Sequence, residues 1–176
     1  MTIGLRHLAA AAAIAGATAV FAGAGTASAM PTDYRCTAGQ VDTTLVPGDP
    51  GAGQRYAYVQ FTAKPGVSCN FEGALPVTLT GADGIAVQPT TEVSPVVTIE
   101  AGQSATMLLH WTGIEAPENQ VTPASVTVTA PGTTDPRGVD SDPHITLPWN
   151  QGPLDDSVDT HSLDVGAVTA GAAPVR

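Results

Sequence analysis

The sequence predicts an all-β protein, specifically an immunoglobulin-like antiparallel β-sandwich with one disulfide. After residue 30 no long amphipathic helical pattern occurs, and Pro and Gly recur every few residues with Val and Thr between them. This composition is typical of short strands joined by frequent turns. With no helix available to cover a sheet, the apolar strand faces are buried only if two sheets pack on each other. A small β-barrel is the alternative architecture.

The clearest strand is expected over residues 54–64. Ala57, Val59 and Phe61 alternate there with polar or tyrosine side chains. Because successive side chains of a strand point to opposite faces, these three residues should share the core face. A shorter strand should precede it over residues 41–45.

The middle of the chain is expected to form one hairpin and one further turn between strands. Asp83-Gly84 is typical of a tight turn with positive φ, and should join strands at 77–79 and 85–88. A second turn at Gly102 should join strands at 96–99 and 103–112. Three further strands are expected over residues 125–130, 145–149 and 162–168, with a long surface loop over 131–143.

The first 29 residues are typical of a cleaved export signal. Arg6 and His7 give a short basic start, the run over residues 8–21 is apolar, and Ala27-Ser28-Ala29 offers small residues for cleavage before Met30. The alternative, a transmembrane anchor, is disfavoured because the apolar run is too short to span a bilayer. The expected organisation is therefore a signal peptide (1–29), a single β-sandwich domain (30–169) and a disordered tail (170–176), with the mature chain secreted.

The charge balance excludes several classes of partner. The chain has 6 basic and 16 acidic residues and a formal net charge of −10, and loss of Arg6 with the signal makes the mature chain more negative still. Nucleic acid and anionic membrane surfaces both require a basic footprint. The acidic surface is interpreted as a contribution to solubility, and a basic partner or a divalent cation remains compatible with it.

The two cysteines, Cys36 and Cys69, are expected to form a disulfide. Cysteines of an exported chain generally pair with each other. The rival interpretation is a reactive thiol, which needs a nearby His or a helix N-terminus, and neither is found beside either residue. A loop of this size stabilises a fold by about 3–4 kcal/mol.

No catalytic, cofactor or metal motif is found. The chain has neither Gly-x-Ser-x-Gly nor His-Glu-x-x-His, and its mature part has no phosphate-binding glycine loop. Two acidic loops are candidates for calcium sites, but neither has EF-hand spacing, and both are interpreted as solvated charge. Their candidate ligands are Asp140, Asp142 and His144 in the first loop, and Asp155, Asp156, Asp159 and His161 in the second. No catalytic, cofactor-binding or metal-binding residue is therefore assigned.

The aromatic residues have mainly structural interpretations. Tyr56 and Tyr58 should lie on the outward face of the strand over 54–64, as cross-strand pairs that stiffen the sheet. Exposed aromatics of this kind also bind glycans or partner proteins. His110 is interpreted as a surface or packing residue, and Trp111 and Trp149 as core residues.

Several segments combine into one pattern of order and spacing: residues 53–56, 59–62, 69–73, 76–79, 82–84, 97–105, 109–111 and 145–149. This pattern resembles the actinobacterial secreted family called domain of unknown function 4232. The resemblance covers about residues 36–168, with Ala63 standing where family members usually have Asn. It implies a secreted β-sandwich with Cys36 paired to Cys69, and it implies no activity.

These observations predict a secreted, non-enzymatic β-sandwich that acts as an extracellular binding or envelope-associated module. The alternative is a secreted enzyme or enzyme inhibitor with a site that no motif reveals. The expected partner is an extracellular protein or a glycan, with no nucleic acid and, after signal cleavage, no membrane.

Overall fold

The computed structural model describes residues 34–174, and the chain is all-β, as predicted. The predicted export signal lies outside the described residues. Two short 3-10 turns, η1 (Ala38–Gln40) and η2 (Pro117–Asn119), accompany the strands. The strands are β1 (Val41–Pro47), β2 (Gln54–Ala63), β3 (Ser68–Phe71), β4 (Val77–Thr80), β5 (Ala86–Pro89), β6 (Val97–Glu100), β7 (Ser104–Thr112), β8 (Gln120–Val121), β9 (Ser125–Thr129), β10 (His144–Pro148), β11 (Leu154–Asp155) and β12 (Ser162–Ala170).

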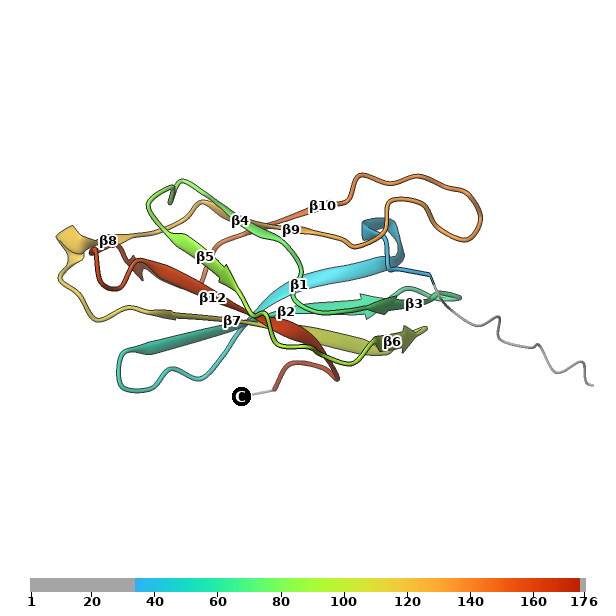
Figure 1. Cartoon of the computed structure of the whole chain (residues 1–176), viewed down its shortest axis with the longest axis horizontal. Coiled ribbons are helices and arrows are strands. Elements are labelled where there is room, and N and C mark those ends of the chain that lie inside the picture. The colour runs from blue at the N-terminus through green and yellow to red at the C-terminus, as the bar shows by residue number, and fades with distance from the viewer. Residues whose placement is uncertain (1–33, 175–176) are drawn as a thin grey trace, which may run out of the picture.

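The strands form two packed layers (Figure 1). One layer is a five-stranded sheet in the order β1-β2-β7-β12-β5, and the other is built on a three-stranded sheet in the order β10-β9-β4. Two small ribbons, β3-β6 and β11-β8, complete the fold. All pairs are antiparallel except β5 with β12, which is parallel. The sheets are open at their edges, so the sandwich prediction is confirmed and the barrel alternative is not adopted.

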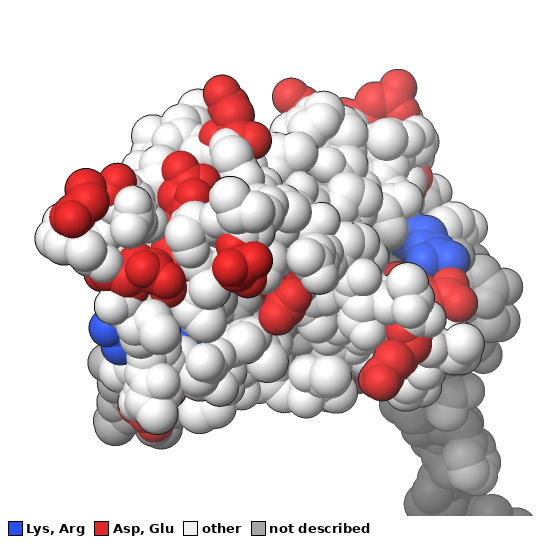
Figure 2. All heavy atoms as spheres, turned by 60° about the vertical axis from the view of Figure 1, so that its left-hand side comes forward, with Lys and Arg blue, Asp and Glu red and all other residues white. Residues whose placement is uncertain are grey.

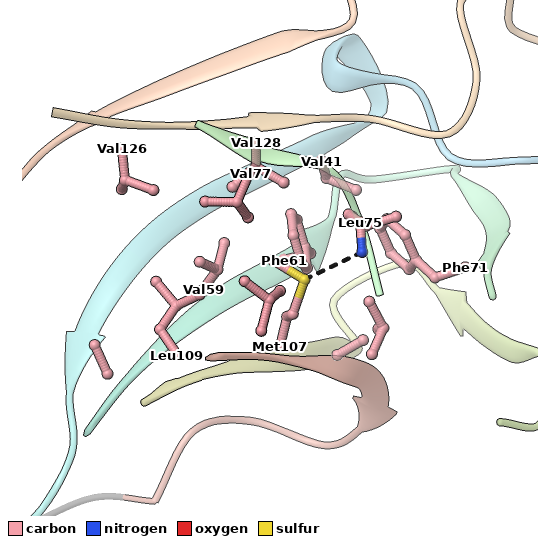
Figure 3. Close-up of a cluster of buried hydrophobic side chains, with 14 of the residues drawn as sticks. Val41, Val59, Phe61, Phe71, Leu75, Val77, Met107, Leu109, Val126 and Val128 are labelled. Atoms are coloured by element: carbon pink, nitrogen blue, oxygen red, sulfur yellow. Dashed lines mark hydrogen bonds between the residues drawn. The ribbon is translucent and has the colours of Figure 1, made fainter. Parts of the chain in front are cut away.

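The core lies between the two layers and follows the predicted alternation. Ala57, Val59 and Phe61 of β2 are all fully buried. Ala105, Met107, Leu109 and Trp111 are their counterparts on β7. Figure 3 shows Val126 and Val128 of β9 facing Val59 and Leu109 across the space between the sheets. Period-two alternation therefore identifies the core side of the central strands correctly.

The predicted disulfide is confirmed. Cys36 and Cys69 are both fully buried, and their Cα atoms lie 4.9 Å apart. Backbone hydrogen bonds flank the bond, since Cys36 N–H donates to Asn70 O and Asn70 N–H donates to Tyr34 O. The disulfide therefore attaches the segment before β1 to strand β3.

The predicted hairpin at Asp83-Gly84 is wrong. Strand β4 pairs with β9, whereas β5 pairs with β12 of the other layer. A tight hairpin turn of this type needs positive φ at both central positions, but Gly84 does not have it; the positive φ falls at Gly81. Ala82 and Ile85 are both buried. The chain does turn here, with a hydrogen bond from Ile85 N–H to Ala82 O, but this turn connects strands of two different sheets.

The C-terminal segment also differs from the expected disorder. Ala170 ends β12, and the chain beyond it stays against the five-stranded sheet. Ala173 is buried, and its N–H donates a 2.8 Å hydrogen bond to Gln60 Oε1 on β2. The described part of the tail is therefore docked. Among residues 34–174 there is no helix long and apolar enough to cross a membrane.

Candidate functional site

A row of four side chains crosses the outer face of the five-stranded sheet. The strand registers pair Tyr56 with His110, His110 with Asp164, and Asp164 with Gln88. These residues come from β2, β7, β12 and β5, which are adjacent in the sheet. The sheet therefore gathers an aromatic ring, an imidazole, a carboxylate and an amide in one line on a solvent-facing surface.

His110 is the centre of this row. Its ring stacks on Tyr56, with ring centroids 4.9 Å apart. Its Nδ1 lies 3.0 Å from Asp164 Oδ2, and its Nε2 is hydrogen-bonded to Gln54 Oε1. Three neighbours therefore fix the orientation of the imidazole, and about half of the Asp164 side chain stays exposed, at 52%. The predicted cross-strand role of Tyr56 is confirmed.

A groove opens beside this row. It has a volume of about 650 Å³, within the range of small-molecule and peptide sites. Leu108 and Gly166 line its floor, and Thr90, Thr91 and Glu92 come from the segment that follows β5. Gly166 lies at the irregular step of the β7-β12 pairing, where a Cβ would lie 3.4 Å from Leu108 Cβ. The missing side chain at Gly166 therefore leaves the space above Leu108 open.

The groove continues along the sheet. A second hollow of about 480 Å³ shares Thr90, Glu92, Leu108 and Gly166 with the first. Tyr58, Val93, Ser94 and Pro95 are among its other lining residues. Val93 is fully exposed. The two hollows together form one open, elongated surface, called the outer-sheet groove below.

The Asp164–His110 pair in the outer-sheet groove is not arranged as the base of a serine or cysteine nucleophile. An Asp–His pair can activate a nucleophile, but the base needs a free nitrogen facing a Ser or Cys. Here Gln54 already occupies Nε2 of His110, and no Ser or Cys lines the hollow beside this ring. Aromatic, amide and carboxylate groups around an apolar floor are the usual lining of a binding site.

The first acidic loop uses its carboxylates internally. Asp140 accepts a 2.6 Å hydrogen bond from Thr134 Oγ1. Asp142 accepts from the N–H of His144 and contacts its Nδ1, and these hydrogen bonds lower the pKa of the Asp142 carboxyl. Asp140 therefore joins the two sides of the loop at Thr134, and Asp142 stabilises the turn that leads into β10.

Asp135 organises the preceding part of the same loop. Its carboxylate accepts hydrogen bonds from the backbone N–H groups of Val139 and Arg137 and from the Arg137 guanidinium. The bond from Val139, followed by that from the Arg137 side chain, lowers the pKa of this carboxyl. The loop over 131–143 is thus a structured turn, which its Gly/Pro/Asp-rich sequence did not indicate.

In the second acidic loop, the interpretation of Asp155 as solvated charge is wrong. Asp155 is fully buried, and strand β11 pairs it with Gln120 of β8. Its oxygens accept hydrogen bonds from Ile114 N–H at 3.1 Å and from Glu115 N–H and Gln120 Nε2 at 3.0 Å. Burial raises the pKa of Asp155, but hydrogen bonding to its oxygens, from Ile114 N–H first, outweighs this effect, so the net pKa lies below the ordinary value of 3.8. Asp155 therefore holds the segment 113–120 in place.

The other candidate ligands of this loop do not gather around Asp155. Asp156 and Asp159 are exposed, and His161 Nδ1 lies 3.0 Å from Ser157 O. Within residues 34–174, no group of three or more His, Cys, Asp or Glu side chains is arranged to hold a metal ion. Trp111 and Trp149 are buried and in contact, with ring centroids 5.0 Å apart, which confirms their core assignment.

Sequence reasoning singled out Tyr56 and His110 with mainly structural roles, and it missed the residues that join them. Asp164, Gln88 and Glu92 carry no motif, and they join the site only through the pairing of β12 with β7 and β5. The sequence shows that acidic residues and tyrosines are present. Which of them share a face depends on strand register, for which no local signal exists.

The family model of a domain of unknown function, DUF4232, matches residues 36–169. The match covers most of the chain, so the protein belongs to this family. Comparison with curated proteins gave no match, and comparison with solved structures gave none either.

Proposed function

We propose that this protein is a secreted, non-enzymatic binding module, and that its partner binds in the outer-sheet groove. The observation that carries this proposal is the row Tyr56–His110–Asp164–Gln88, held in register beside an open apolar floor. Recognition surfaces typically combine exposed aromatic residues and apolar surface with neighbouring polar groups. The occupied Nε2 of His110 disfavours the alternative of a hydrolytic enzyme.

Secretion is supported by the pattern over residues 1–29 and by the disulfide, which is stable in oxidising compartments. We expect the exported protein to begin at or within a few residues of Met30. Mass spectrometry of the protein from culture medium measures this N-terminus. An intact Met1 on extracellular protein would contradict the signal-peptide assignment.

The groove itself is tested by filling it. In Gly166→Tyr, the new side chain would occupy the space above Leu108, and the φ of Gly166 lies outside the left-handed region, so the backbone accepts a side chain. We expect this variant to fold and to lose partner binding by about tenfold or more, because the centre of the surface is blocked. The measurement is capture of partners from native culture medium by immobilised wild-type and variant protein.

The matched control is Gly51→Tyr. Gly51 is exposed, a Cβ added there would meet no atom within 4 Å, and the residue lies outside the hollows described above. This variant should capture the same partners as the wild type. Equal capture by Gly166→Tyr and wild type would show that binding occurs elsewhere and would overturn the groove assignment.

A further inference from the structure

The charged groups of the outer-sheet groove all have one sign. Glu92 and Asp164 line it, and neither Lys nor Arg is found among the residues that line its two hollows. The nearest basic side chain along β2, Arg55, instead donates a hydrogen bond to Gly113 O. Acidic side chains also outnumber basic ones over the face shown in Figure 2. Phosphate, sulfate and carboxylate ligands would therefore meet repulsion here.

The carboxylates of Asp164 and Glu92 differ in whether they already have a partner. Asp164 is bound to His110 through one oxygen, whereas the exposed Glu92 side chain has no hydrogen-bond or ion-pair partner among the described residues. The Glu92 backbone is fixed by a hydrogen bond from its N–H to Thr90 Oγ1. Glu92 is thus a carboxylate at the groove wall that can receive a cation without first giving up another partner.

The uncharged lining also suits a cationic side chain. Leu108 and Pro89 offer apolar surface for an aliphatic stem, and the Tyr56–His110 stack presents an aromatic group beside it. Long basic side chains bury their stems on apolar surface while the charged head stays near water. Guanidinium groups additionally pair with carboxylates in a fork geometry and stack on aromatic rings.

We propose that the outer-sheet groove binds an arginine-containing basic segment of a partner protein, with Glu92 as the principal carboxylate that recognises the guanidinium. This rests on the proposed function, and it names the partner chemistry of the same site. A polypeptide is favoured over a free amine because the two hollows are open and continuous, and the exposed Val93 offers contact to residues beside the arginine. Charge complementarity decides the sign of the partner.

The proposal is tested on the secreted mature protein with end-blocked octapeptides in which Ala alternates with Arg, Gln or Glu. Isothermal titration calorimetry at low and high salt measures their affinities. We expect only the Arg peptide to bind, with weaker binding at high salt, because salt screens exposed charges. Glu92→Gln should weaken it about tenfold. Glu118→Gln, which removes an exposed carboxylate outside the groove, should leave the affinity within about twofold.

If Glu92→Gln and Glu118→Gln weaken binding of the Arg peptide equally, the peptide is attracted by the overall charge of the protein. This result would overturn the site. Binding of chitotriose or maltotriose, with no binding of the Arg peptide, would replace the cationic partner with a glycan. Absence of peptide binding, combined with Gly166-dependent capture from culture medium, would reject the arginine proposal and leave the groove function standing. If Gly166→Tyr captures partners from culture medium as well as the wild type does, the groove function itself is rejected.

Discussion

Replacing both cysteines in Cys36→Ser/Cys69→Ser should lower the free energy of unfolding by about 2–5 kcal/mol. The disulfide closes a loop with a sequence separation of 33, and its removal restores conformational freedom mainly to the unfolded chain. Both positions are fully buried, so the serine hydroxyls would also enter an apolar environment. Urea unfolding of the wild type and the double variant, followed by tryptophan fluorescence, measures the difference. Reduced wild-type protein is the control. It should reproduce most of the loss in free energy of unfolding, without the cost of burying two serine hydroxyls.

The loosened region should be the segment before β1 rather than β1 itself. Strand β1 pairs with β2 along its whole length, from Val41 with Ala63 to Pro47 with Ala57. Residues 34–37 before it are attached by the disulfide and by hydrogen bonds to Asn70 and Gly132, whereas residues 39 and 40 accept separate hydrogen bonds from Lys64. Hydrogen exchange should therefore accelerate first around residues 34–37. Earlier loss of protection in β1, or a stability change below about 1 kcal/mol, would contradict this account.

The parts of the fold that the sequence predicted are those governed by local patterns. Alternation alone identifies the buried faces of β2 and β7, because side-chain direction in a strand repeats every two residues. The Cys36–Cys69 bond followed from the number of cysteines. Both inferences need no knowledge of which strands are neighbours.

The sequence-based predictions that were wrong concern contacts between segments that are distant in the chain. Asp83-Gly84 has the composition of a hairpin turn, yet β5 pairs in parallel with β12, which lies far along the chain. A turn does form there, because Ile85 N–H donates to Ala82 O, but the strands on its two sides belong to different sheets. This pairing places Gln88 beside Asp164, and the equally long-range pairing of β12 with β7 places Asp164 beside His110, so the candidate site was hidden for the same reason.

Asp155 is the clearest case of a residue whose role depends on its surroundings. Its sequence neighbours, Asp156 and Ser157, are typical of a solvated loop, but Leu154 beside it is fully buried and anchors β11 against β8. The carboxylate is thereby carried inside, where it accepts hydrogen bonds from the backbone N–H groups of residues 114 and 115 and from the Gln120 amide. A buried carboxylate needs such donors, and these three groups supply them.

Replacing this carboxylate in Asp155→Asn should therefore lower the free energy of unfolding by about 3 kcal/mol at pH 7. The amide keeps one acceptor oxygen, but its NH2 group would face N–H donors that Asp155 now satisfies. Asp156→Asn is the matched control, because Asp156 is exposed and adjacent in sequence. It should change stability by less than about 0.5 kcal/mol. Thermal and urea unfolding measure both variants.

The pH dependence separates loss of the Asp155 charge from a general packing defect. The folded-state pKa of Asp155 lies below its ordinary value of 3.8, so the unfolded chain binds the proton more readily. The stabilisation is fully present above that value and is lost as the pH falls from it through the folded-state pKa. The difference in free energy of unfolding between wild type and Asp155→Asn should therefore narrow below about pH 4. If the difference in free energy of unfolding stays constant down to about pH 2, Asp155 contributes through shape alone. This result would refute the role assigned to its charge.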